Sequence, residues 1–93
     1  MANLDVFRGL ISHGEVDQAI EGLSLLLVDK AYENDRDTIF YLRGNAYRKK
    51  GDWKRALDNY QYAIDLNPDT PASEAKAMVM EILNFYNKDM YNH

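Results

Sequence analysis

The sequence contains no cysteine, and this absence excludes disulfide bonds, thiolate zinc sites and cysteine nucleophiles together. Only two prolines and five glycines interrupt the 93 residues, and the glycines stand singly, so the chain has no glycine-rich phosphate loop. The longest mostly apolar stretch, residues 23–28, is too short to span a bilayer. The first residues lack the basic start and apolar run of a signal peptide, and we therefore expect a cytoplasmic location.

The composition is that of one small globular domain covering residues 1–93, with 46% hydrophobic and 28% charged residues. The formal net charge of −4 argues against nucleic-acid binding. The only histidines, His13 and His93, are too far apart to form a metal site with scattered carboxylates. An enzyme using Ser12 or His13 is disfavoured, because consecutive residues on a helix do not face each other. We therefore expect neither catalysis nor a cofactor.

Apolar residues recur at spacings of three and four, which is typical of helices. Five helices are predicted, at residues 3–12, 16–30, 38–49, 53–66 and 71–90. A loop is predicted over residues 29–37, between the second and third helices. Asp37, Asp52 and Thr70 are predicted to accept hydrogen bonds from the free amides at helix starts. Gly14 and Gly51 supply the tight turns between paired helices.

The chain repeats itself at an offset of 37 residues, since Gly14 and Ala19 correspond to Gly51 and Ala56. Two similar helical hairpins followed by a lone helix are typical of a short solenoid. Residues 37–70 form a unit of 34 that resembles a tetratricopeptide repeat (TPR). The positions that carry the resemblance are Phe40, Gly44, Tyr47, Gly51, Trp53, Ala56, Tyr60, Ala63 and Pro68.

The resemblance implies a small standalone TPR protein with an all-α fold. Two TPR-like antiparallel helical hairpins and a C-terminal capping helix would form a short right-handed α-solenoid. Its parts are a degenerate repeat over 1–36, a well-matched repeat over 37–70, and the capping helix and tail over 71–93. Gly44 and Ala56 are expected to lie close to neighbouring helices, because small residues permit close approach. Two residues depart from the pattern. Phe7 occupies the position that corresponds to Gly44, where the pattern predicts glycine. Arg43 occupies a position where the family usually has leucine, so the aliphatic stem of Arg43 is expected to pack while its guanidinium reaches solvent.

In this family the first helix of each hairpin lines a concave groove, so the resemblance implies a noncatalytic protein–protein interaction module that binds a peptide or protein segment. The predicted groove residues are Arg8, Ser12, Tyr41, Asn45, Arg48, Lys49, Lys76 and Met80, with Val79 and Leu83 as further candidates. Asn45 is expected to bridge a bound backbone as donor and acceptor. One subclass of the family binds the C-terminal carboxylate of chaperones through a clamp of lysine, asparagine and arginine side chains. Only Asn45 and Lys76 approximately match the positions of that clamp, so no such clamp is expected.

Basic residues are concentrated in the middle of the chain, where six of the eleven fall between positions 43 and 55, namely Arg43, Arg48, Lys49, Lys50, Lys54 and Arg55. The cluster is interpreted either as a solvated face with cations at a helix C-terminus or as a positive field that attracts an acidic peptide. The expected partner is a protein or peptide, with no nucleic acid and no membrane. The alternative function is self-association into a homodimer through the last helix, and sedimentation distinguishes the two.

Overall fold

Helices make up most of the computed structural model, which describes the backbone of residues 4–91 and the side chains of residues 4–85. The elements in chain order are α1 (Asp5–Ser12), α2 (Val16–Leu27), the 3₁₀ helix η1 (Lys30–Asp35), α3 (Arg36–Lys50), α4 (Trp53–Leu66) and α5 (Ala72–Tyr91). No strand occurs within residues 4–91. The prediction of an all-α helical-repeat fold is confirmed.

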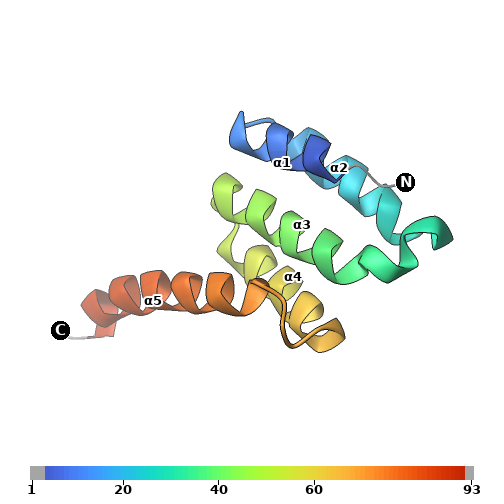
Figure 1. The fold of residues 1–93 in the computed structure, drawn as a ribbon. Helices are drawn as coiled ribbons and strands as arrows, with labels where there is room; N and C mark the ends of the chain where they lie inside the picture. Colours follow the sequence, from blue (N-terminus) through green and yellow to red (C-terminus); the bar gives the residue numbers. More distant parts are fainter. Residues whose placement is uncertain (1–3, 92–93) are drawn as a thin grey trace.

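Helices that follow one another along the chain also pack together (Figure 1). α1 packs on α2 and α3 packs on α4, so each pair forms a hairpin, and the contact between α2 and α3 joins the two hairpins. The first half of α5 packs on α4, whereas its second half extends past the ends of α3 and α4 (Figure 1). The last helix therefore covers its neighbour over part of its length.

The segment between α2 and α3 differs from the predicted loop. α2 ends at Leu27, three residues before the predicted end, and η1 leads directly into α3 at Arg36. The Asp29 carboxylate starts η1 by accepting a hydrogen bond of 2.9 Å from the backbone N–H of Ala31. The prediction that Asp37 caps the third helix is wrong, because Asp37 lies inside its first turn. Its carboxylate instead accepts a hydrogen bond of 2.9 Å from Asn67 Nδ2 and so ties the start of α3 to the end of α4.

The other predicted helix caps and turn glycines match the structure, although α1 begins at Asp5 and not at the predicted residue 3. Asp52 accepts a hydrogen bond of 3.1 Å from the backbone N–H of Arg55, as expected of an N-cap. Thr70 Oγ1 accepts one of 3.3 Å from the N–H of Ala72, the first residue of α5. Gly14 and Gly51 have φ values of 85° and 88°, a left-handed conformation that glycine adopts without a Cβ penalty. These local signals account for the starts of α4 and α5 and for the turns that follow α1 and α3.

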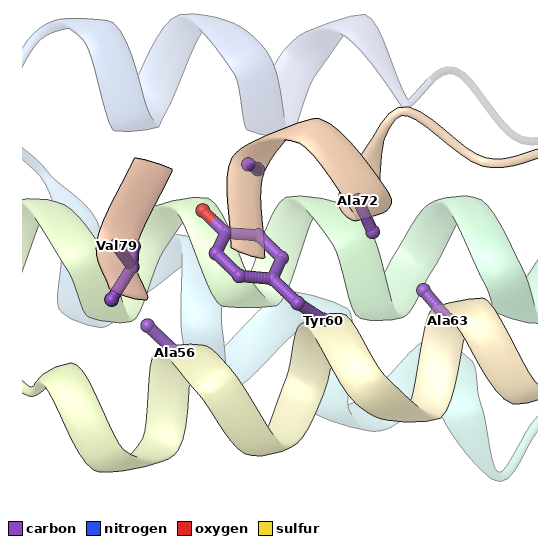
Figure 2. Packing of buried hydrophobic residues seen from close by; sticks show 6 residues of the cluster. Ala56, Tyr60, Ala63, Ala72 and Val79 are labelled. Atoms are coloured by element: carbon purple, nitrogen blue, oxygen red, sulfur yellow. The ribbon is translucent and has the colours of Figure 1, made fainter. Parts of the chain in front are cut away.

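Two clusters of buried side chains form the core. The first gathers α2 and α3 around Ala19, Leu23 and Ile39, and α1 covers it with partly buried side chains. The second joins α4 to α5 through small residues and Tyr60, and Figure 2 labels Ala56, Tyr60, Ala63, Ala72 and Val79. Tyr41 packs against both clusters, so α3 is the element that links them.

Each hairpin places an aromatic ring directly over a glycine. In the second hairpin the Tyr60 ring of α4 covers Gly44 of α3, where an added Cβ would lie 2.5 Å from Tyr60 Cε1. In the first hairpin the Phe7 ring of α1 covers Gly22 of α2, where an added Cβ would also overlap the ring. The predicted close approach at Gly44 is confirmed. Both hairpins therefore contain a ring-on-glycine contact. In the first hairpin the ring lies on the first helix and the glycine on the second, whereas in the second hairpin the order is reversed.

Arg43 follows its predicted packing only in part. Its guanidinium carbon lies 5.8 Å from the ring centroid of Tyr47, a cation–π arrangement. Its Nε, however, is buried and has no hydrogen-bond partner among the residues that the structure describes. The expectation that the whole guanidinium reaches solvent is therefore wrong at Nε, because the Tyr47 ring holds the group against the protein surface.

Candidate functional site

A shallow hollow of about 250 Å³ lies between α1 and α3 and brings together four of the predicted groove residues. We call it the α1–α3 hollow, and its lining consists of Arg8, Ile11, Ser12, Tyr41, Leu42 and Asn45. Arg8 and Ser12 reach it because they lie four residues apart on one face of α1. Tyr41 and Asn45 have the same spacing on α3.

A larger hollow of about 650 Å³ adjoins the first and adds side chains from α4 and α5. We call it the α3–α5 hollow, and its lining consists of Ile11, Asn45, Arg48, Lys49, Trp53, Met78 and Ile82. Ile11 and Asn45 line both hollows, so the two are continuous, and together they are called the groove. Six of the eight predicted residues line it, namely Arg8, Ser12, Tyr41, Asn45, Arg48 and Lys49.

The residues expected from the last helix are placed differently. Val79 is fully buried in the core, so its prediction as a groove residue is wrong. Met80 is 41% exposed but lines neither hollow, and Met78 and Ile82 line the groove instead. Successive helical residues are rotated by about 100°, so Met78 and Met80 flank the buried Val79 on opposite sides. The apolar pattern of the helix alone does not show which flank faces the groove.

Lys76 and Leu83 also lie outside the two hollows. The Lys76 ammonium donates a hydrogen bond to Gln61 Oε1 on α4. Leu83 packs, partly buried, against the second core cluster. Trp53, which is identified in the sequence only as a position of the repeat pattern, also lines the groove. Its position at the start of α4 was visible in the sequence, but its distance from α5 depends on how the two helices cross.

Asn45 occupies the junction of the two hollows and is held there by a buried tyrosine. Its Oδ1 accepts a hydrogen bond of 2.6 Å from the Tyr60 hydroxyl. Burial raises the pKa of Tyr60 to about 12, although the nearby positive charge of Arg48 opposes the rise, so the hydroxyl stays protonated and donates. The side-chain oxygen of Asn45 therefore already accepts one hydrogen bond, whereas its two amide N–H groups are bonded to no described residue and are the donors that it offers to a ligand.

The basic cluster divides into paired and unpaired cations. Lys50 contacts Asp17 at 2.7 Å, Lys54 contacts Asp58 at 3.0 Å, and Arg55 contacts Asp52 at 2.7 Å. The two cations in the groove differ from these. Lys49 Nζ donates a hydrogen bond of 3.3 Å to the backbone carbonyl of Ser12, and Arg48 forms no ion pair with any residue that the structure describes.

A separate apolar hollow of about 450 Å³ lies on α2, α3 and α4 and contains none of the predicted residues. Its lining consists of Leu27, Arg36, Phe40, Tyr62, Asp65 and Leu66. Phe40 and Tyr62 contact each other there, with ring centroids 5.2 Å apart. Arg36 and Asp65 give this hollow one charge of each sign, in contrast to the groove.

Ser12 and His13 do not form a catalytic pair. Ser12 Oγ and His13 Nδ1 both bond to the backbone carbonyl of Gly9, at 3.0 and 2.7 Å. Because a carbonyl only accepts, each of these side chains donates to it, and the two satisfy the end of α1. Over the residues that the structure describes, no group of three histidine or acidic side chains is placed to hold a metal ion. No helix within the same part of the chain has the length and hydropathy of a membrane span.

Residues 38–70 match the tetratricopeptide repeat family. The solution NMR structure of Bacteroides fragilis protein BF1650 is similar to this chain with a TM-score of 0.82 and 52% sequence identity. That similarity covers 99% of this chain and 91% of the Bacteroides protein. No curated protein matches the sequence.

Tetratricopeptide repeats generally act as noncatalytic modules for protein–protein interaction. The family match covers the second hairpin, α3 and α4, which contributes most of the groove. Residues 38–70 are therefore a tetratricopeptide repeat, and the chain as a whole is a relative of the Bacteroides protein.

Proposed function

We propose that this protein binds a segment of a partner protein in the groove and performs no catalysis. The observation that carries the proposal is the continuity of the two hollows along α1, α3 and α5. A continuous surface accepts several consecutive residues of a ligand, whereas an isolated pocket accepts one. The amide N–H groups of Asn45 are the donors for a bound backbone, and Tyr41 supplies a rigid amphipathic ring.

Self-association through α5 is the second candidate, because α5 exposes large apolar side chains. Met78 is 56% exposed and Phe85 is 66% exposed, and Met80 and Ile82 are also exposed. Met78, Ile82 and Phe85 line one hollow on α5, whereas Met80 lies on the other flank of Val79. At about 200 Å² for a large side chain, the exposed parts of these three residues provide roughly 300 Å². A stable interface buries about 800 Å² on each partner, so this face alone supplies less than half of what a homodimer needs. Binding of a partner segment remains the leading proposal.

The test is affinity capture from the native cell with mass spectrometry of the recovered proteins. Three forms are compared: the native chain, the groove variant Asn45→Ala/Arg48→Glu, and the matched control Gln18→Ala/Lys54→Glu. The control likewise removes a side-chain amide and reverses a positive charge, at exposed positions outside the groove. Circular dichroism confirms that all three remain helical.

We expect the native chain and the control to recover the same partner, and the groove variant to lose it. A partner recovered equally by all three forms would contradict groove binding. Proteins that bind nonspecifically should be recovered equally by all three forms, so they do not affect the comparison.

A further inference from the structure

The charge of the groove differs from that of the rest of the molecule. The chain carries a net charge of −4, yet the lining of the two hollows contains three cations, Arg8, Arg48 and Lys49, and no carboxylate. Three other hollows within the described residues include acidic side chains, and one of them, which contains Glu81, shares Met78 and Ile82 with the α3–α5 hollow. A positive recess in an acidic protein favours an anionic ligand and disfavours a cationic one.

Arg48 is the cation in the groove that is available to a ligand. Arg8 Nη1 already contacts Asp5 at 2.9 Å, and Lys49 donates to the Ser12 carbonyl. Arg48 forms no ion pair within the described residues and is only partly exposed. A partly buried guanidinium binds a carboxylate more strongly than an exposed lysine does, because two N–H groups donate to it in a medium of lower dielectric constant.

Apolar side chains surround the same position. Trp53, Met78 and Ile82 line the α3–α5 hollow together with Arg48, and Ile11 closes it on the α1 side. Met78 is 56% exposed, and a flexible thioether adapts to ligand side chains of different shape. At about 650 Å³, this hollow has more than twice the volume of the α1–α3 hollow, which leaves space for a bulky side chain.

We propose that the ligand of the groove is an acidic peptide segment in which a bulky apolar residue stands next to a carboxylate. The apolar side chain enters between Trp53, Met78 and Ile82, and the carboxylate pairs with Arg48. This inference rests on the proposed function and specifies the chemistry of the partner. Single-stranded nucleic acid is the competing anion, because bases stack on a tryptophan, but few free cations and a net negative charge disfavour a phosphate backbone.

The experiment is an unbiased selection of ligands by the intact protein. A phage-displayed library of random peptides is selected on the native chain, and the enriched peptides are synthesised with a fluorescent label. Their dissociation constants are measured by fluorescence anisotropy for the native chain and four variants. A labelled oligothymidylate is measured in parallel as the nucleic-acid probe.

The variants form two matched pairs. Arg48→Glu and Lys54→Glu make the same charge reversal inside and outside the groove. Met78→Ala and Met80→Ala shorten the same side chain on the two flanks of Val79. All four positions are at least partly exposed, so the variants are expected to fold, and circular dichroism checks that they do.

The expected result is enrichment of Asp or Glu beside an aromatic residue, leucine or methionine. Arg48→Glu should weaken binding by about tenfold or more, as the loss of a charge-assisted hydrogen bond implies, and Lys54→Glu by less than about twofold. Met78→Ala should weaken binding by about threefold to tenfold, and Met80→Ala should leave it unchanged. Binding should also weaken as the salt concentration rises.

Two kinds of failure are distinguishable. Enriched peptides that are uncharged or basic, but whose binding is weakened by Met78→Ala and not by Met80→Ala, would overturn this inference and leave the proposed function standing. Tight binding of the oligothymidylate by the native chain would also overturn it. If no peptide is enriched, or if the enriched peptides bind all groove variants equally, both this inference and the proposed function are contradicted.

Discussion

Replacing Gly44 with alanine is expected to destabilise the second hairpin, because the new methyl group has no space. A Cβ at this position would lie 2.5 Å from Tyr60 Cε1, 2.6 Å from Cδ1 and 3.2 Å from Cζ. Carbon atoms in favourable contact are about 3.5–4.0 Å apart, so the overlap is about 1 Å. Tyr60 is fully buried and its hydroxyl is bonded to Asn45, so the ring has little freedom to move aside.

The free-energy change is the balance of two opposing effects. Overpacking a core costs about 1–3 kcal/mol, and displacing the Tyr60 hydroxyl from Asn45 adds about 1 kcal/mol. Alanine in a helix interior gains about 1 kcal/mol over glycine. The net loss is about 2 kcal/mol, which for a domain of this size lowers the melting temperature by about 10 °C.

The assay is thermal and urea unfolding followed by circular dichroism. Gly9→Ala is the matched control, because Gly9 also lies inside a helix and an added Cβ there would meet nothing within 4 Å. This variant should be as stable as the native chain or more stable. In a Tyr60→Leu background, Gly44→Ala should cost less than it does in the native chain. If Gly44→Ala unfolds at the native temperature, or costs the same in both backgrounds, the packing argument is refuted.

Two further predictions concern pH. Burial raises the pKa of Tyr60 from its ordinary value of 10.0 to about 12, so the folded state retains this proton longer than the unfolded state and loses stability as the pH rises from about 10 towards 12. Urea titrations should show the stability advantage of the native chain over Tyr60→Phe shrinking across that window, and a constant difference would contradict the assignment. Hydrogen bonds and the charge of Arg55 hold the pKa of Asp52 below its ordinary value of 3.8, so the stability that ionised Asp52 provides is present above that value and is lost as the pH falls through the lowered pKa. The melting-temperature advantage of the native chain over Asp52→Asn should therefore shrink as the pH falls below 3.8, because only the native chain loses a charge at this position, and a constant difference would contradict the assignment.

The helices and their pairing could be predicted from the sequence because their signals are local. Gly51 requires a left-handed backbone, and Asp52 caps the next helix whatever surrounds it. The start of α3 could not be predicted, because α3 follows directly from the 3₁₀ helix η1 and the residue before it, Asp35, makes no side-chain capping hydrogen bond. Asp29 starts a 3₁₀ turn, and Asp37 is engaged by Asn67 from 30 residues away.

The groove was predictable where it depends on position within a hairpin and unpredictable where it depends on how helices cross. Tyr41 and Asn45 face α1 because they lie on one face of the first helix of a matched repeat. The choice between Met78 and Met80 depends on the rotation of α5 on α4, which the apolar pattern around Val79 leaves undetermined. The Tyr60 hydrogen bond that occupies the oxygen of Asn45 likewise joins two helices.

The exchange of ring and glycine between the helices of the first hairpin bears on engineering by family consensus. A consensus design would replace Phe7 with glycine, the residue found at position 44 of the matched repeat. That substitution would remove the ring that covers Gly22 and leave two glycines facing a void. The two hairpins are therefore not interchangeable building blocks, and a repeat can be transplanted only when its ring and its glycine move together.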